Sequence, residues 1–492
     1  MIRRKARVAI VGAGVSGLCT AVTLQQAGIN DFTIFERGEG VGGTWSDHTY
    51  PGLSCDVPSR FFQYSFDLNP DWSARYSTGE EIHSYLERVA SRFDLYRRIR
   101  FGVAVTRAEF RDGAWLVTTS DGECGTFEFL VTACGFMSDP IYPQLPGLSA
   151  FAGPVIHSAD WDRDVDTSTK RVGLVGTGAS GVQLTIWLAA NAEHLTVFQR
   201  NPPWVVPRFN RHHLRLTRML HRRLPGWSRT AYRYQEARHA LVLSRPLTHP
   251  GILRWMVKHV CRAYLHTVRS PALRAKLTPS YEPMCKRIIL SSDFYRAVQR
   301  PNVTLETSSI DRIEPTGILT ADGAHHPCDI LVLATGYDTH TYMNHIDITG
   351  DGGVKLKDLW RGGPQTYHGV TIPCMPNFFS ILGPFAPTGA YSAIAVAEMH
   401  ARFATKWITC WQNGAVDTIA PTAEATSRFQ RALTTAARRT VWSAGCRNPY
   451  VGSLGIPEVS PWSPWAHRQA LRTPEPNDWQ FTHGPPHHLD SG

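Results

Sequence analysis

The sequence predicts an α/β fold built from two similar units, and three observations predict it. Residues 12–17 form a glycine-rich pattern, G-x-G-x-x-G. It follows an apolar, strand-like run and precedes a helical pattern. The same arrangement returns at residues 176–181. The length of 492 residues suits two or three domains better than one core. We therefore expect two Rossmann-like dinucleotide-binding domains, with a helical insertion in the second.

The first unit opens with a short buried strand at residues 7–11 and continues, after the glycine turn, into a helix at residues 18–27. The turn supplies three glycines, which are Gly12, Gly14 and Gly17. Glycine is needed because the turn is tight and its backbone must come close to a pyrophosphate, which the helix N-terminus binds. A second strand, residues 32–35, ends at Glu36. Its carboxylate can accept hydrogen bonds from ribose hydroxyls and disfavours a 2′-phosphate at this site.

The second unit repeats this order with a strand at residues 170–175 and a helix at residues 182–190. Its turn contributes four small residues, which are Gly176, Gly178, Ser180 and Gly181. The following strand, residues 195–198, ends in Gln199 and Arg200 instead of an acid. An arginine there can bind a 2′-phosphate through two hydrogen bonds, although an exposed strand-end charge is the simpler alternative. We therefore expect FAD in the first unit and NADPH in the second.

Two longer motifs accompany the glycine turns. Residues 42–56 read G-G-x-W-x4-Y-P-G-x3-D, and residues 151–162 read F-x-G-x3-H-x3-W-D. Alone, the second stretch would be a loop whose aromatic residues fill the core. Together the motifs resemble the signatures of the type I Baeyer-Villiger monooxygenases, which are class B flavin-dependent monooxygenases. The matching residues of the second stretch are Phe151, Gly153, His157 and Trp161.

The resemblance implies which further residues lie near the cofactors. The matching positions are Gly43, Thr44, Trp45, Tyr64, Ala334, Thr335 and Gly336. A Gly-Gly pair followed by a large aromatic residue suits a loop that folds over a flat ring. Phe62 stands where members of the family often have tyrosine, so that one hydroxyl is missing here.

The resemblance also assigns the catalytic groups. Arg287 matches the catalytic cation, Lys286 lies near the NADPH phosphate, and Asp56 orients and charge-balances the arginine. A C4a-peroxyflavin must stay deprotonated to attack a carbonyl, and a fixed guanidinium stabilises that anion and the resulting oxyanion. Without the resemblance, a Lys-Arg pair is more often surface charge. The implied reaction is the NADPH- and O2-dependent conversion of a ketone or aldehyde, as a small-molecule carbonyl substrate, to an ester or lactone.

Three alternatives stay open. A flavin monooxygenase that oxidises nitrogen or sulfur shares both nucleotide units, but it needs a protonated hydroperoxide. A disulfide or pyridine-nucleotide reductase would use a C-x-x-C pair, which the sequence lacks. A non-enzymatic flavoprotein could dock a partner through residues 201 to about 280, where the sequence is basic, aromatic and largely helical in pattern.

The resemblance sets the expected order of the domains along the chain. They are an FAD-binding domain at residues 1–145 and 336–481, an NADPH-binding domain at 146–335 with a helical insertion at about 205–280, and a flexible tail at 482–492. The stretch 151–162 would then form the hinge between the domains. We expect a conformational role for His157 rather than an acid–base role.

Three departures from the family pattern concern the substrate pocket. Phe385 stands where relatives usually have asparagine, and Ala390-Tyr391 stand where a histidine precedes the next serine. Pro449 lies in a region where relatives often carry Ser-Trp-Tyr. The flavin chemistry does not depend on these positions, but the identity of the substrate does.

Composition limits the partners, metal sites and cellular location that we expect for the protein. The basic residues behind the net charge of +10 are spread rather than blocked into tails, although many fall between Arg208 and Lys276, and this disfavours a nucleic-acid partner. The ten cysteines form no C-x-x-C pair, so we expect neither a metal site nor a disulfide framework, and we expect a cytoplasmic protein. No apolar run is long enough to span a membrane as a helix. For the oligomeric state, we expect a monomer or a weak homodimer. The basic helical segment could touch a membrane surface, but it shows no clean amphipathic stripe.

Overall fold

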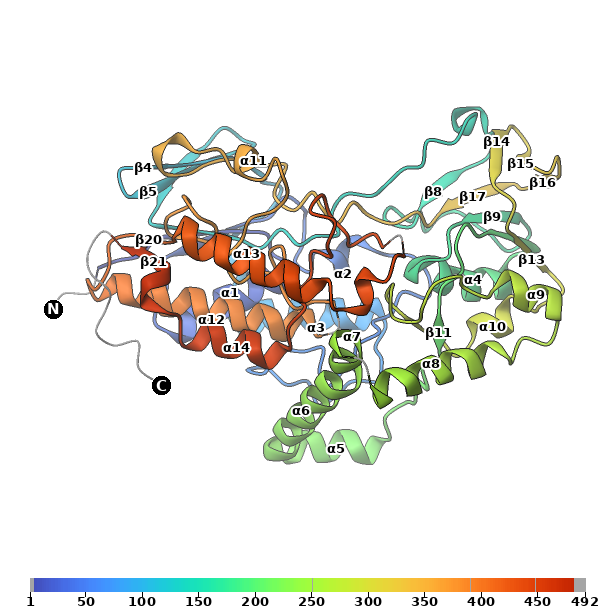
Figure 1. The fold of residues 1–492 in the computed structure, drawn as a ribbon, viewed down its shortest axis with the longest axis horizontal. Coiled ribbons are helices and arrows are strands. Elements are labelled where there is room, and N and C mark those ends of the chain that lie inside the picture. The colour runs from blue at the N-terminus through green and yellow to red at the C-terminus, as the bar shows by residue number, and fades with distance from the viewer. Residues whose placement is uncertain (1–3, 250, 390, 447, 482–492) are drawn as a thin grey trace.

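Two five-stranded parallel sheets form the centres of the two ends of the molecule (Figure 1). The computed structural model describes residues 4–249, 251–389, 391–446 and 448–481. Every pairing within these two sheets is parallel, and helices lie against both sheets. The predicted α/β fold with two Rossmann-like units is confirmed. Ala390 and the predicted tail at residues 482–492 lie outside the described residues.

The first sheet has the strand order β19–β7–β1–β2–β3. Its strands are β1 (Val8–Val11), β2 (Phe32–Phe35), β3 (Ile99–Arg100), β7 (Phe129–Thr132) and β19 (Phe378–Ser380). All residues of β1 and β7 are buried, as expected for central strands covered on both faces. Strand β19 comes from far along the chain, so the chain returns to the first sheet after it has built the second.

Helices cover the first sheet. They are α1 (Val15–Gln26), α3 (Gly79–Arg92), α12 (Ala393–Gln412), α13 (Ala423–Ala437) and α14 (Pro464–Arg472). Helix α3 begins with a capping residue, because the Thr78 side chain accepts a hydrogen bond from the Glu81 amide. Helices α1 and α12 pack against each other and belong to one continuous hydrophobic core.

The second sheet has the order β13–β10–β9–β17–β8. Its strands are β8 (Val155–His157), β9 (Arg171–Val175), β10 (His194–Phe198), β13 (Val303–Glu306) and β17 (Ile330–Leu333). Helices α4 (Ala179–Asn191) and α10 (Phe294–Ala297) pack beside it. The sheet therefore repeats the strand–turn–helix order of the first unit.

Smaller sheets flank the two units. One contains β18 (Asp347–Thr349), β4 (Val105–Arg111), β5 (Ala114–Thr119) and β6 (Cys124–Phe127), and another contains β14 (Ile310–Glu314), β15 (Gly317–Thr320) and β16 (His325–Pro327). Two-stranded pairs join β11 (Val205–Val206) to β12 (Ile289–Leu290), and β20 (Ile419–Pro421) to β21 (Trp479–Phe481). Short helical segments complete the described chain: α2 (Thr44–Asp47), α11 (Leu356–Leu359), η1 (Tyr96–Arg98), η2 (Leu148–Ala150), η4 (Asp351–Gly353), η5 (Val441–Ser443) and η6 (Pro476–Asp478).

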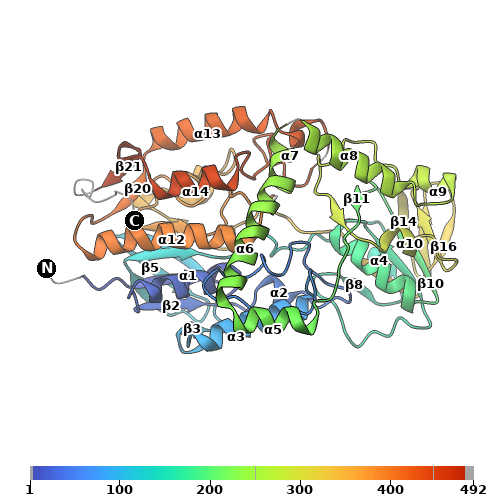
Figure 2. The same ribbon diagram turned by 90° about the horizontal axis from the view of Figure 1, so that it is seen from below.

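A helical segment lies between β11 and β12. It contains α5 (Arg215–Arg223), α6 (Pro225–His239), η3 (Ala240–Ser244), α7 (Arg245–Thr248), α8 (Ile252–Leu265) and α9 (Pro271–Lys276). Helices α5, α6 and α8 run along the lower side of the molecule in Figure 1 and lie in front of the sheets in Figure 2. Among the residues that the structure describes, no helix combines the length and the apolar character that a membrane span requires.

The cysteines correct one prediction. Cys285 and Cys446 form a disulfide, although the scattered cysteines predicted no disulfide framework. The two residues are 161 positions apart and share no local spacing, so only the return of the chain brings them together. Eight further cysteines are free.

Candidate active site

The first glycine turn brings the backbone of three segments into close contact. A Cβ atom on Gly12 would lie 2.8 Å from the Ala133 carbonyl oxygen, and one on Gly17 would lie 1.8 Å from the Gly12 carbonyl oxygen. Gly12 also has a φ of +105°, which side chains rarely allow. The turn therefore needs glycine, and it leaves the N-terminus of α1 beside an open backbone cradle of the kind that holds a pyrophosphate.

The second glycine turn has the same contacts. Gly176 has a φ of +111°, and its Cβ would lie 2.4 Å from the Ala334 carbonyl oxygen. A Cβ on Gly181 would lie 2.1 Å from the Gly176 carbonyl oxygen. Gly178 precedes α4, and a Cβ added to it would have no atom within 4 Å, so its side is open to a ligand. Each turn thus packs against the end of a neighbouring strand, which is β7 for the first turn and β17 for the second.

The G-G-x-W segment lies directly on the first turn. Gly14 forms a bridge with Gly42, and a Cβ on Gly43 would lie 3.1 Å from the Gly14 Cα. Thr44 begins α2, and the Trp45 ring packs edge-on against Phe62 at 5.4 Å. This arrangement leaves a glycine-lined surface over which a flat ring could lie.

Tyr64, which the resemblance placed near the cofactors, has a buried side chain that faces the protein interior and not an open site. Its side chain is fully buried, and its hydroxyl donates a 2.7 Å hydrogen bond to the Val15 carbonyl oxygen. The Tyr64 amide donates to the Tyr85 hydroxyl at 2.8 Å. Tyr64 therefore holds the first turn of α1 in place through the backbone.

The two strand ends carry opposite charges. The Glu36 carboxylate accepts hydrogen bonds from the Ala13 amide at 2.6 Å and the Gly38 amide at 2.8 Å. Arg200 is exposed at the end of β10. Burial lowers the pKa of Lys286, and the positive charge of Arg200 lowers it further. Two cations that lie close together form a suitable site for a phosphate.

Arg287 and Asp56 form an ion pair at the centre of the site. The Arg287 Nη2 lies 2.7 Å from Asp56 Oδ1 and 2.6 Å from Oδ2. Asp56 raises the pKa of Arg287, and Tyr450 contributes in the same direction. The guanidinium is therefore permanently charged, while 46% of its side chain stays exposed and faces a pocket.

The pocket beside Arg287 is lined by both cofactor units and the return segment. Its lining residues are Phe136, Arg287, Thr339, Tyr342, Leu382, Gly383, Thr388, Gly389, Tyr450, Glu458 and Val459. Phe385, which follows this wall, has a φ of +68° and is buried. Asparagine tolerates that conformation better than phenylalanine, so the departure from the family pattern stores strain at the pocket wall.

The linker stretch 151–162 contains strand β8 (Val155–His157) and the loop residues on either side of it. A Cβ on Gly153 would lie 2.1 Å from the Asp329 carbonyl oxygen, while Phe151 and Trp161 are buried. His157 Nδ1 accepts a hydrogen bond from the Ala159 amide at 3.0 Å, and its Nε2 lies 3.2 Å from Thr335 Oγ1. Because Thr335 donates its own proton to the Ile141 carbonyl oxygen, His157 Nε2 must donate to Thr335. Both ring nitrogens are therefore engaged with protein atoms.

Contacts between the units also involve residues that sequence reasoning had assigned only to cofactors. Ser180 donates to the Tyr50 hydroxyl at 3.1 Å, and Tyr50 donates to Gln183 at 2.8 Å. Gly336 has a φ of +89° and its carbonyl accepts from the Ile141 amide. The Y-P-G part of the first motif thus joins the two units.

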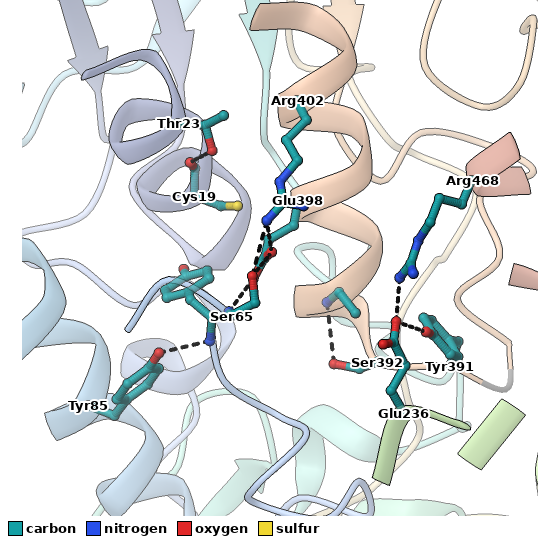
Figure 3. Close-up of polar contacts among 12 residues, drawn as sticks. Cys19, Thr23, Ser65, Tyr85, Glu236, Tyr391, Ser392, Glu398, Arg402 and Arg468 are labelled. Atoms are coloured by element: carbon teal, nitrogen blue, oxygen red, sulfur yellow. Dashed lines mark hydrogen bonds and ion pairs between the residues drawn. The ribbon is translucent and has the colours of Figure 1, made fainter. Parts of the chain in front are cut away.

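Sequence reasoning missed two polar clusters and the disulfide. Glu398 on α12 accepts from the Ser65 amide and hydroxyl and pairs with Arg402 at 2.9 Å (Figure 3). Glu236 on α6 accepts from the Tyr391 hydroxyl at 2.6 Å and pairs with Arg468 on α14 (Figure 3). Apart from the pair within α12, the partners are distant in sequence, and no local motif marks them.

The disulfide is next to the candidate catalytic cation. Cys285 precedes Lys286 and Arg287, and the Asn448 side chain donates a 2.9 Å hydrogen bond to the Cys285 carbonyl oxygen. The disulfide partner, Cys446, lies in the same loop as Tyr450. The loop is therefore fixed to the Arg287 segment at two points. The Pro449 carbonyl in this loop accepts from His340 Nε2 at 2.9 Å.

The chain is similar to known proteins along most of its length. Residues 5–411 match the family model described as flavin-binding monooxygenase-like. The chain belongs to this family. It is 45% identical over 482 residues to an uncharacterized monooxygenase of Mycobacterium tuberculosis, a match that covers 98% of this chain and 97% of the relative. It is 35% identical to a Baeyer-Villiger monooxygenase of Streptomyces coelicolor over 92% of this chain and 88% of the relative.

Two solved structures show the same fold. A steroid monooxygenase bound to NADP matches with a TM-score of 0.87 and 30% identity, over 97% of this chain and 100% of the other. The OTEMO complex with FAD and NADP matches with a TM-score of 0.86 and 26% identity, over 97% and 99%. The resemblance to Baeyer-Villiger monooxygenases that the two motifs suggested is therefore confirmed.

Proposed function

We propose that the protein is an NADPH- and O2-dependent monooxygenase that converts a ketone or aldehyde to an ester or lactone. The observation that carries this proposal is the charged, pocket-facing Arg287 held by Asp56, in a chain whose two glycine turns share the same backbone contacts at their first and last glycines. Relatives named Baeyer-Villiger monooxygenase support the same activity.

The residues of the two turns fit the expected cofactors. The first turn, the G-G-x-W segment and Glu36 would hold FAD, because the glycine contacts leave a backbone cradle and a carboxylate at the end of β2 can accept hydrogen bonds from ribose hydroxyls. Gly176, Gly178, Gly181, Arg200 and Lys286 would hold NADPH. When bound, the flavin accepts hydride from NADPH and activates oxygen.

Arg287 acts on the charge that develops during oxygen transfer. Its guanidinium stabilises negative charge on the attacking oxygen and on the former carbonyl oxygen of the substrate. Asp56 fixes the direction of the guanidinium and balances its charge before the substrate enters. Electrophilic oxidation of nitrogen or sulfur would gain nothing from this cation, so it is the weaker candidate.

A set of variants separates flavin reduction from oxygen transfer. In Arg287→Ala we expect normal FAD content and normal anaerobic reduction by NADPH, but at least ~10²-fold less ester formation and release of hydrogen peroxide instead. Products of a ketone screen are followed by mass for the gain of one oxygen. Arg312→Ala, an exposed arginine on the strand β14, is the control and should behave as the parent.

Two outcomes would contradict this function. If the parent protein oxygenates amines or thioethers but only releases peroxide with ketones, the protein oxidises heteroatoms. If FAD is bound but NADPH never bleaches it under nitrogen, the protein is a non-enzymatic flavoprotein.

A further inference from the structure

The helical segment between β11 and β12 concentrates the positive charge of the chain. Residues 201–280 contain fourteen arginines and two lysines but only one acidic residue, Glu236. The remaining residues hold 35 basic and 40 acidic side chains, since the whole chain has 51 and 41. This segment is therefore strongly cationic on a molecule that is otherwise slightly acidic.

The single carboxylate of the segment does not neutralise its outer surface. Glu236 points toward the first unit, where it binds Tyr391 and Arg468 (Figure 3). Outside partners neutralise only two of the cations in the described part of the segment, since Arg222 pairs with Asp71 and Lys258 pairs with Glu282. Within the described part of the segment, eight exposed arginines form no ion pair: Arg211, Arg215, Arg223, Arg229, Arg233, Arg245, Arg262 and Arg269.

Exposed apolar side chains lie among these cations at helical spacing. On α8, four side chains are about half exposed or more, namely Ile252 (74%), Trp255 (57%), Met256 (50%) and Val260 (47%). The same spacing of i, i+3, i+4 and i+8 occurs around α5 in Leu216, Met219, Leu220 and Leu224, which are 37–60% exposed. Residues at this spacing share one helix face. The opposite face of α8 is buried through Cys261 and Leu265.

These two apolar stripes correct the expectation from sequence that the segment has no clean amphipathic stripe. The stripe of α8 could not be recognised in the sequence because this helix also has a buried apolar face. Apolar residues therefore occur on more than one side of the helix. Both helices lie on the side of the molecule that faces the viewer in Figure 2.

We propose that α5 and α8 dock the protein on the surface of an anionic phospholipid membrane. Apolar side chains would enter the boundary between headgroups and acyl chains, while the surrounding arginines would bind lipid phosphates. Tryptophan favours this boundary, which suits Trp255. A nucleic acid would match the cations but would leave the two apolar stripes without a partner. A second copy would bring two cationic faces together.

Vesicle binding tests the proposal with the full-length, FAD-loaded protein. We expect the protein to sediment with phosphatidylcholine vesicles that contain phosphatidylglycerol, to bind pure phosphatidylcholine vesicles much more weakly, and to be released by salt. The triple variant Ile252→Ser, Trp255→Ser, Met256→Ser should bind at least about tenfold more weakly, because each buried apolar side chain contributes more than the ~1.4 kcal/mol of a tenfold change.

A matched control replaces an exposed tryptophan elsewhere. Trp465 on α14 is 50% exposed, and Trp465→Ser should bind vesicles like the parent. FAD absorbance and anaerobic flavin reduction confirm that each variant is folded. These readouts need no substrate, so failure of the docking proposal is distinguishable from failure of the proposed oxygenation.

Four results would overturn the proposal. They are no sedimentation with anionic vesicles, equal binding by the triple variant, binding of duplex DNA without binding of vesicles, or self-association that the triple variant abolishes. The third would assign the face to nucleic acid, and the fourth to a second copy of the chain.

Discussion

The two glycine turns share their backbone contacts, but the strands that follow them end in opposite charges. In each turn the first glycine would clash with an Ala carbonyl oxygen, and the last glycine would clash with the first glycine's own carbonyl. After the first turn, two backbone amides fix the Glu36 carboxylate. After the second, Arg200 lies exposed near Lys286.

This difference separates what the backbone supplies from what a side chain selects. Both turns provide backbone N–H groups and space for a pyrophosphate, so either turn could bind the pyrophosphate of either dinucleotide. The residue at the strand end selects between a ribose with a free 2′-hydroxyl and a ribose with a 2′-phosphate, because a carboxylate repels the phosphate and an arginine binds it. Substitutions at the turns should therefore remove a cofactor, whereas substitutions at the strand ends should change its identity.

The largest effect is expected at the last glycine of each turn. In Gly17→Ala the new methyl group would lie 1.8 Å from the Gly12 carbonyl oxygen, so α1 cannot keep its place and FAD binding should be lost. In Gly181→Ala the corresponding distance is 2.1 Å, and we expect FAD to remain bound while reduction by NADPH is lost. The ratio of flavin absorbance to protein absorbance and the rate of anaerobic reduction measure the two outcomes.

A third glycine variant controls for the substitution itself. Gly40→Ala places a methyl group in open space at an ordinary φ, so both cofactor readouts should match the parent. Loss of FAD from Gly181→Ala would contradict the idea that each turn serves its own cofactor.

A smaller effect is expected at the end of β10. Arg200→Gln should raise the KM for NADPH about 10- to 100-fold, the equivalent of roughly 1.5–3 kcal/mol for hydrogen bonds to a charged group, and should leave the KM for NADH unchanged. Arg300→Gln, an exposed arginine in the same half of the molecule, is the control. A parallel rise for both nucleotides would show that Arg200 does not contact a 2′-phosphate.

The features that the sequence predicted are those that depend on local backbone chemistry. The strand–turn–helix order needs glycine at fixed spacing, so residues 12–17 and 176–181 could be located without a structure. The Arg287–Asp56 pair, separated by 231 positions, was predicted only through the family resemblance. The disulfide and the Glu236 cluster could not be predicted, because they form where the return segment meets distant elements and no local pattern marks either partner.

The disulfide provides a test of how the two units are joined. It links the segment before Arg287 to the loop that carries Tyr450. In Cys446→Ser we expect unchanged FAD content and flavin reduction, but several-fold less oxygen transfer, because Arg287 loses part of its support. Cys124→Ser, a free and exposed cysteine, should have no effect. If reduction and oxygen transfer fall together, the disulfide stabilises the whole fold and not the position of Arg287 in particular.

The smallest effect is expected in the linker stretch 151–162, where His157 contacts Thr335. His157→Ala should slow flavin reduction or NADP⁺ release while FAD stays bound, since Nε2 holds the linker to Thr335 after β17 and Nδ1 fixes the turn at Ala159. Burial lowers the pKa of His157 below its usual value of 6.5. The unfolded chain therefore takes up the proton first as the pH falls. The stability from the neutral ring is complete above pH 6.5, begins to fall near that value, and is lost once the pH has passed through the lowered pKa.

The dependence of the melting temperature on pH isolates this contribution. Several other buried histidines also have lowered pKa values, among them His48, so the parent protein should lose stability steeply below pH 6.5. His157→Ala should flatten this slope, because one of the groups that titrates only after unfolding is gone. An unchanged slope together with an unchanged reduction rate would make His157 a residue of the loop core without a role in the movement between the two units.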